Sequence, residues 1–331
     1  PHLVIAGSSG SGKSVLIYSM YLQLSANNHP EDLEFWLIDP KIGLQQLGRS
    51  ENTGQGRFVD SWSHGDGNFY IACRDMLKDA VDEMARRNGI FNKKMQELED
   101  NAADGELVPV IDKLAVARSI GIKEGPLPDG SPNPLVQPYI VIIIDECALL
   151  FTPSTNKEVK DLQAEILFHA SRLARESRSA GIHCVFATQY PTTVSLPSLI
   201  KQQSARIGLM TQDNIASRVI IDQDGLEELF LKGSGKIQEG KNYRDFRGFL
   251  LEDDKLNEHS MSELLASFPK RKTPQGATAG IPGQQSQDPD YITIPEPDSS
   301  IFSRWNTNSK QARALRSAVG ENLDGSKSDQ K

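Results

Sequence analysis

Apolar runs alternate with amphipathic stretches along most of the chain. Five short apolar runs predict buried strands, at residues 3–6, 35–38, 139–144, 184–187 and 206–210. Three longer stretches carry apolar residues at helical spacing and predict helices, at residues 13–24, about 75–97 and 157–179. Strands that alternate with helices in this way favour an α/β fold with a mostly parallel sheet.

Two segments depart from this alternation. Residues 99–138 carry polar, turn-rich sequence on both sides of LVPVIDKLAVA, and they predict an inserted loop region that is partly ordered. From Lys270 onward the chain becomes rich in Pro, Gly, Gln and Ser, which is typical of a flexible tail. We therefore expect a folded domain over residues 1–268 and a tail over 269–331. Apolar residues within 301–319 could form a short helix there, a floppy segment being the alternative.

Net charge, cysteine content and the length of apolar runs limit the classes of protein to which this chain can belong. The 331 residues carry a net charge of −8, so the chain is no basic nucleic-acid wrapper, and any contact with phosphate must come from local basic loops. The three cysteines form no CxxC pair and are expected to be small buried thiols of a reducing, cytoplasmic protein. No apolar run approaches the roughly 20 residues that span a bilayer. The chain starts two residues before a strand, so an upstream segment could still tether it to a membrane.

The first predicted strand runs into GSSGSGKS, which has the spacing G-x-x-x-x-G-K-[ST] and precedes a predicted helix. This is the context that a phosphate-binding loop requires, because its backbone N–H groups and the helix N-terminus both favour anions. Lys13 is predicted to neutralise the β- and γ-phosphates of a nucleotide, and Ser14 to ligate Mg²⁺. The predicted nucleotide contacts are Gly7, Ser8, Ser9, Gly10, Ser11, Gly12, Lys13, Ser14 and Val15.

A second strand ends in the acidic pair of YIVIIIDE. Asp145 is placed to hold Mg²⁺, directly or through water, and Glu146 to polarise the attacking water. A protein that only binds nucleotide does not need the second carboxylate, so the pair predicts hydrolysis. An acidic cap of a strand end is the plainer alternative.

The stretch RSAGIHCVFATQ brings an arginine and a glutamine to the two ends of one strand. Gln189 follows the strand and can sense the γ-phosphate or orient water, because its amide both donates and accepts. Arg178 precedes the strand and is therefore expected at the opposite edge of the sheet, where it could serve a neighbouring subunit's nucleotide. This implies a ring of subunits. Arg172 and Arg175 compete for the role, and a solvated charge at a helix end is the alternative for each.

Together these residues resemble the FtsK/SpoIIIE family of hexameric DNA translocases. The resemblance extends over about residues 1–268, interrupted by the longer 99–138 segment, and it implies a RecA-like P-loop NTPase core. It rests on the segments PHLVIAGSSGSGKS, LIDPK, VIIIDE, RSAGIHCVFATQYP, LIKQQSARIGL, SRVIIDQDGLEELFLKGSGK and FRGFLLEDD.

The resemblance implies ATP and Mg²⁺ as cofactors and a hexameric ring threaded by double-stranded DNA. By it, Glu146 is the catalytic base, Gln189 the sensor and Arg178 the arginine supplied in trans. Arg218 lies in a segment of less certain role. Asp39 belongs to the outer shell of the site or simply caps its strand, and KGSGK is interpreted as a turn.

In this family short loops grip the DNA phosphates, and the loop after Gln189 is a candidate for that contact. Thr192, Thr193 and Lys201 are the predicted DNA-binding residues, an ordinary surface loop being the alternative. The chain shows no C-terminal winged-helix module, and its 99–138 segment is long. Both features favour mobile-element transfer or phage defence over chromosome segregation. A secretion motor of the type VII kind, moving protein substrates, and a nucleotide-gated scaffold are the competing interpretations.

Overall fold

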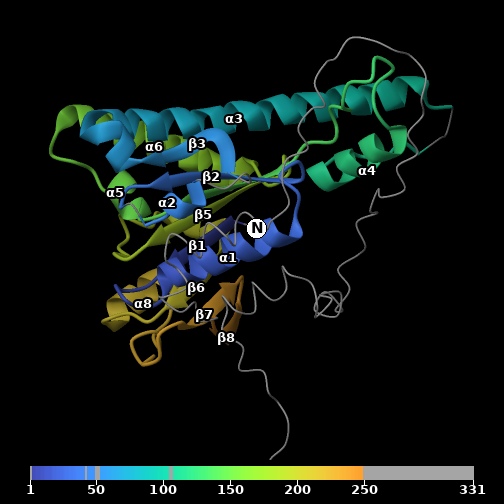
Figure 1. The fold of residues 1–331 in the computed structure, drawn as a ribbon. Coiled ribbons are helices and arrows are strands. Elements are labelled where there is room, and N and C mark those ends of the chain that lie inside the picture. Colours follow the sequence, from blue (N-terminus) through green and yellow to red (C-terminus); the bar gives the residue numbers. More distant parts are fainter. Residues whose placement is uncertain (1, 42, 49–52, 104–106, 249–331) are drawn as a thin grey trace, which may run out of the picture. The chain divides into compact units, whose positions relative to one another are not determined.

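A single mixed sheet forms the centre of the fold in the computed structural model, which describes residues 2–41, 43–48, 53–103 and 107–248 (Figure 1). Its strand order over these residues is β3-β2-β4-β5-β1-β6-β7-β8. Neighbouring strands are parallel from β3 to β6, and β7 and β8 add an antiparallel hairpin. The strands are β1 (His2–Ala6), β2 (Leu33–Asp39), β3 (Thr53–Asp60), β4 (Tyr139–Ile144), β5 (Ile182–Thr188), β6 (Ser204–Leu209), β7 (Ser234–Glu239) and β8 (Asn242–Arg247).

Helices connect the parallel strands and lie on both faces of the sheet. The helices are α1 (Lys13–Asn27), α2 (Gln45–Gly48), α3 (Ser61–Asn101), α4 (Leu114–Glu124), α5 (Cys147–Phe151), α6 (Lys157–Glu176), α7 (Ser198–Gln202) and α8 (Asn214–Ile221). The predicted α/β class, with a mostly parallel sheet, is therefore confirmed.

Alternate residues of the central strands face opposite helix layers, as the period of two in a strand requires. Ile142 of β4 and Phe186 of β5 belong to one large apolar cluster, together with residues of α3 and α6. Figure 1 shows α1 on the other side of the sheet, where Tyr21 of α1 packs on Phe35 of β2 with ring centroids 4.3 Å apart. Burial on both faces explains the continuous apolar runs of the sequence.

The five predicted strands all form, and three further strands were not predicted. β3 has the sequence TGQGRFVD and lacks an apolar alternation. β7 and β8 form the edge hairpin, where β8 is almost entirely exposed and therefore carries polar residues. The KGSGK segment makes a turn at Gly233, as predicted, and then enters β7.

Within the segment predicted to be a partly ordered loop region, residues 107–138 include a helix. Helix α3 continues beyond the sheet, and α4 lies alongside its far end (Figure 1). A second apolar cluster forms there, made of Phe91, Ile111, Leu114, Ala117 and Leu135. The amide of Leu114 donates to the carbonyl of Ser179 (2.7 Å), which anchors the segment to the turn before β5.

The sequence also led to predictions about the domain end, the tail, the cysteines and membrane-spanning helices. The domain end at residue 268 and the helix at 301–319 lie outside the described residues. Cys73, Cys147 and Cys184 are buried free thiols, as predicted, and burial raises the pKa of Cys184 to about 12. None of the described helices is both long and apolar enough to cross a bilayer.

Candidate active site

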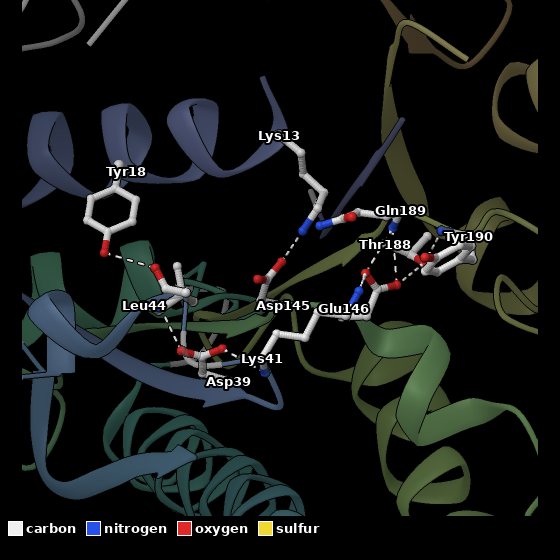
Figure 2. Close-up of polar contacts among 11 residues, drawn as sticks. Lys13, Tyr18, Asp39, Lys41, Leu44, Asp145, Glu146, Thr188, Gln189 and Tyr190 are labelled. Atoms are coloured by element: carbon white, nitrogen blue, oxygen red, sulfur yellow. Dashed lines mark hydrogen bonds and ion pairs between the residues drawn. The ribbon is translucent and has the colours of Figure 1, made fainter. Parts of the chain in front are cut away.

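Four neighbouring strands of the sheet end at one edge, and each is followed by polar residues. Strands β2, β4, β5 and β1 are adjacent and parallel, so their carboxyl ends line up side by side. Ligands of open parallel sheets bind beyond such ends. Figure 2 shows the side chains that these strand ends bring together, from Lys41 after β2 to Lys13 at the start of α1.

The loop after β1 is fixed to the strands on both sides of it. The amide of Gly7 donates to the carbonyl of Thr188 (3.3 Å), and the amide of Ser8 donates to the carbonyl of Met210 (2.9 Å). A Cβ atom at Gly7 would lie 2.7 Å from the Cβ of Leu209, so only glycine fits at this position. The loop is thereby held in place between β5 and β6.

The end of this loop presents uncapped backbone donors. Gly12 precedes α1 with φ 102°, a left-handed conformation that favours glycine, and no side chain caps the first turn of the helix. The hydroxyl of Ser11 is buried and has no hydrogen-bond partner among the described residues. Helix N-termini favour anions because their first N–H groups lack intrahelical partners. The local structure therefore fits the phosphates of a nucleotide.

Lys13 and Asp145 form a buried ion pair in front of the loop (Figure 2). Each side chain is only 3% exposed. The Asp145 carboxylate and the Ser14 hydroxyl are the oxygen ligands that could hold Mg²⁺. No group of three or more His, Cys, Asp or Glu residues gathers as a metal site within the described part of the chain. A Mg²⁺ ion that is bound together with phosphates needs only one or two carboxylates, so the donor set fits.

Glu146 is completely buried and accepts hydrogen bonds from three groups. It takes the left-handed conformation (φ 55°) at the N-terminus of α5. Its Oε1 accepts from the Thr188 hydroxyl (2.7 Å) and the Gln189 amide (3.1 Å), and its Oε2 accepts from the Lys41 ammonium (2.8 Å). Its side chain has no exposed surface. The carboxylate is thus fixed in position by its three donors.

Lys41 was not predicted as a site residue, although it ends the LIDPK segment. The loop that carries it is held by Asp39, whose carboxylate accepts from the amides of Lys41 (3.1 Å) and Leu44 (2.6 Å). Burial raises the pKa of Asp39, and the backbone hydrogen bonds to its carboxylate act against that shift. Tyr18 braces the same loop by donating to the carbonyl of Gly43 (2.9 Å). Asp39 therefore caps the strand, and in doing so it places Lys41.

Gln189 and Arg178 lie at opposite ends of β5. Gln189 follows the strand, and its side chain points toward Lys13 in Figure 2. Arg178 is exposed in the turn before the strand. The seven residues of β5 separate the two by roughly 20 Å at the usual rise per strand residue. Arg178 therefore cannot reach the phosphate loop of its own chain.

The other arginines that the sequence offered are engaged in ion pairs. Arg172 and Arg175 both pair with Glu176, at 3.1 and 2.7 Å. Arg218 makes two hydrogen bonds of 2.7 Å to the carboxylate of Asp224. Arg178 makes no ion pair with any residue in the described ranges.

The loop after Gln189 is tightly folded by side-chain hydrogen bonds. Ser195 donates to the carbonyl of Tyr190 (2.6 Å) and accepts from the amide of Thr192 (2.8 Å). Thr192 and Thr193 are exposed, as a DNA contact requires. Lys201 differs from these two residues in its exposure, since its side chain is mostly buried.

The Lys201 ammonium points into the protein. It donates to the carbonyl of Val219 (2.9 Å) and lies 3.7 Å from a carboxylate oxygen of Asp222. Only 16% of its side chain is exposed. This cation connects α7 with α8, and its contact with DNA stays a prediction.

Comparison with known sequences supports the predicted family. The sequence matches the FtsK/SpoIIIE family profile over residues 1–193. It is 33% identical over 280 residues to the DNA translocase FtsK of Haemophilus influenzae, covering 77% of this chain and 46% of that protein. It is 27% identical over 303 residues to the DNA translocase FtsK of Borreliella burgdorferi, covering 91% of this chain and 33% of that protein. The chain thus spans less than half the length of either relative.

Solved structures show a similar fold at low sequence identity. The pCW3 conjugation coupling protein TcpA, a monomer form with ATPγS, has a TM-score of 0.57 and 22% identity, covering 80% of this chain and 64% of that one. The cytoplasmic domain of the type VII secretion ATPase EccC of Thermomonospora curvata has a TM-score of 0.59 and 21% identity, covering 82% and 28%. These similarities support the P-loop ATPase fold.

Proposed function

The chain belongs to the FtsK/SpoIIIE family and is an ATPase, and from that premise we propose that it is a motor that moves double-stranded DNA through a ring of six subunits. One observation carries the proposal. The phosphate loop, the acidic pair Asp145 and Glu146, and Gln189 lie together at the carboxyl ends of the strands, because β4, β5 and β1 are neighbours in the sheet. Mobile-element transfer or phage defence is the setting that we favour.

The proposed roles follow from position and charge. Backbone N–H groups at the Gly12–Ser14 end of the loop and the ammonium of Lys13 would bind the phosphates, while Ser14 and Asp145 would hold Mg²⁺, which supplies charge neutralisation when it is bound. The present pairing of Lys13 with Asp145 keeps both charges satisfied in a site with little exposure. Binding of phosphates would exchange one ionic partner of Lys13 for another.

Hydrolysis requires a base and a group that orients water. Glu146 is the proposed base, and Gln189 lies beside it and the phosphate loop, where its amide can orient water or sense the γ-phosphate. Arg178 is proposed to act on the nucleotide of the adjacent subunit. Its exposure, its lack of an ion pair within the described ranges and its distance from its own phosphate loop support that role.

The exposed tip of the loop after β5 is proposed to contact the DNA backbone. Thr193 offers its hydroxyl group there, whereas Thr192 would have to exchange its donation to Ser195 Oγ (3.1 Å) for one to a phosphate. Such contacts carry no sequence information. A net charge of −8 is compatible with this role, because six loops would converge on one duplex.

The decisive experiment measures the ATPase rate with and without long double-stranded DNA. We expect the duplex to raise the rate several-fold, and we expect higher salt to remove that stimulation because the contacts are to phosphates. The Glu146→Gln variant is the matched control, because it should bind ATP and DNA but hydrolyse at background rate. A rate that responds to an extended peptide but not to duplex would instead favour a secretion motor.

A further inference from the structure

The carboxylate proposed as the catalytic base has no surface at which water could reach it. A general base must come within hydrogen-bond reach of the proton that it removes, directly or through one water. Glu146 is 0% exposed, and three donors occupy its two oxygens. At least one of these donors must withdraw before Glu146 can accept a proton from an attacking water.

Lys41 is the donor that can withdraw. Thr188 is the last residue of β5 and pairs with Ala6 across the sheet, and Gln189 follows it directly and donates through its backbone amide. The Lys41 ammonium stands instead at the end of a flexible stem, and 35% of its side chain is exposed. The nearby cation Lys13 does not replace Lys41 as a donor to Glu146, because its ammonium is bound to Asp145.

A second contact connects Lys41 to the loop proposed to touch DNA. The Lys41 ammonium lies 5.1 Å from the centre of the Tyr190 ring, within the range of a cation–π interaction. Tyr190 is 64% exposed and begins the folded loop in which Ser195 binds both Tyr190 and Thr192. Figure 2 shows Lys41 extending to Glu146, whose carboxylate lies beside the β5 end that carries Tyr190.

We propose that Lys41 is a positioning residue that restrains Glu146, and that displacement of the Tyr190 loop draws Lys41 away and frees the carboxylate for hydrolysis. This rests on the proposed function, because it takes Glu146 as the base and the loop as the part that the transported polymer moves. It adds a coupling between two contacts of the Lys41 ammonium. The contact with the Tyr190 ring controls the contact with the Glu146 carboxylate. In the absence of polymer the restraint keeps wasteful hydrolysis low.

The first test measures the ATPase rate without any polymer. Lys41→Met keeps the stem of the side chain and removes the ammonium, and we expect the rate to rise about tenfold, equivalent to about 1.4 kcal/mol. Lys41→Arg retains a cation and should keep the rate low. Lys78→Met is the matched control, a surface lysine of α3 that pairs with Asp82 at 2.6 Å, and should leave the rate unchanged. A Lys41→Met rate equal to or below that of the wild type would overturn the proposal.

Folding of each variant is checked by its melting temperature and by binding of a fluorescent ATP analogue. If Lys41→Met does not fold, Tyr190→Ala tests the same restraint from the other side, since it removes the ring against which the Lys41 ammonium lies and so loosens the hold of Lys41 on Glu146. We expect it to raise the polymer-free rate by less than Lys41→Met does. The double variant should match Lys41→Met alone, because both act on one contact. Rate increases that multiply would show independent effects and would contradict the coupling.

The response to duplex DNA separates this proposal from the proposed function. If DNA stimulates the wild type, the stimulation should fall close to unity in Lys41→Met, and unchanged stimulation would refute the restraint. If DNA does not stimulate the wild type, the proposed function fails, while the polymer-free comparison of Lys41→Met with Lys41→Arg still decides whether Lys41 restrains Glu146.

Discussion

The parallel strands of the central sheet have their carboxyl ends along one side, the carboxyl edge, and their amino ends along the other, the amino edge. The two sides bind their buried cations in different ways. At the carboxyl edge, Lys13 and Lys41 pair with the carboxylates of Asp145 and Glu146. At the amino edge, Arg87 is 1% exposed and, besides its pair with Glu83, donates to the carbonyls of Pro138 (2.7 Å) and Ala180 (2.9 Å). Arg118 likewise donates to the carbonyl of Gln137, besides its pair with Asp32.

This difference separates exchangeable charges from structural ones. A lysine paired with a carboxylate can exchange that partner for a phosphate or a metal-bound oxygen without leaving a backbone group unsatisfied. An arginine bonded to backbone carbonyls cannot move without leaving those acceptors buried and unpaired. The carboxyl edge is therefore built for ligand chemistry, and the amino edge for rigidity. Arg178 tests this division, because it is an exposed cation carried by a turn that Arg87 braces.

The largest expected effect is at the carboxyl edge, for Lys13→Ala. We expect loss of detectable ATP binding in calorimetry and, with it, loss of turnover, because the main phosphate-binding cation is removed. The variant also leaves the buried Asp145 carboxylate unpaired, so its melting temperature should fall. Adding Asp145→Asn should recover the melting temperature but not the binding. If the double variant recovered ATP binding as well, Lys13 would be structural, like the arginines of the other edge.

The next effect concerns the exposed arginine of the amino edge. Arg178→Ala should fold and bind ATP normally, yet hydrolyse it about 10³-fold more slowly if the guanidinium completes a neighbour's site. Mixing it with Lys13→Ala subunits should restore part of the turnover, since each variant supplies what the other lacks. A mixture that stays as inactive as its components would exclude catalysis in trans by Arg178.

Stability rather than turnover should respond to Arg87→Met. The substitution leaves the Pro138 and Ala180 carbonyls without their donor, and we expect a loss of about 3 kcal/mol in the free energy of unfolding, measured by urea denaturation. Arg86→Met is the matched control, because Arg86 binds the same Glu83 carboxylate but is 48% exposed. Its cost should stay below about 1 kcal/mol. If the two variants lost the same free energy of unfolding, the burial of Arg87 would not contribute to stability.

The carboxyl edge could be predicted well because its signals are local. A strand, a phosphate loop and a helix follow one another in GSSGSGKS and its flanks, and Asp145, Glu146 and Gln189 each follow an apolar run directly. Parallel strands then bring their ends to one edge. The role of Lys41 could not be predicted in this way, because its contact with Glu146 depends on β2 and β4 being neighbours, and strand order is set by packing across the whole sheet.

The amino edge was harder to predict because its contacts join distant segments. Arg87 and Ala180 are 93 positions apart, and nothing in the local sequence of α3 marks that arginine as buried. The same holds for residues 107–138, whose apolar side chains pack on the continuation of α3. The inward direction of Lys201 could not be predicted either, because its ammonium donates to the carbonyl of Val219, 18 positions away.

The smallest expected effect is a pH dependence of stability at the amino edge, through His2. This residue is fully buried and accepts a hydrogen bond from the amide of Cys184 (3.0 Å). Burial, together with nearby His183 and Arg178, lowers its pKa from the usual 6.5 to about 3. Above pH 6.5 the imidazole is neutral in both states and its contribution is complete. As the pH falls from 6.5 toward 3, the unfolded chain takes up a proton that the folded chain does not, so stability is lost.

That loss amounts to at most about 1.4 kcal/mol for each pH unit in this window. His2→Gln keeps an acceptor for the Cys184 amide but cannot be protonated, so its free energy of unfolding should vary less between pH 6.5 and 5 than that of the wild type. Urea denaturation at several pH values measures both slopes. Identical slopes would mean that His2 is protonated in the folded protein, in conflict with its burial. A shallower pH dependence in His2→Gln would show that the amino edge does not accept an added charge on His2. The carboxyl edge differs, because its lysines can exchange one charged partner for another.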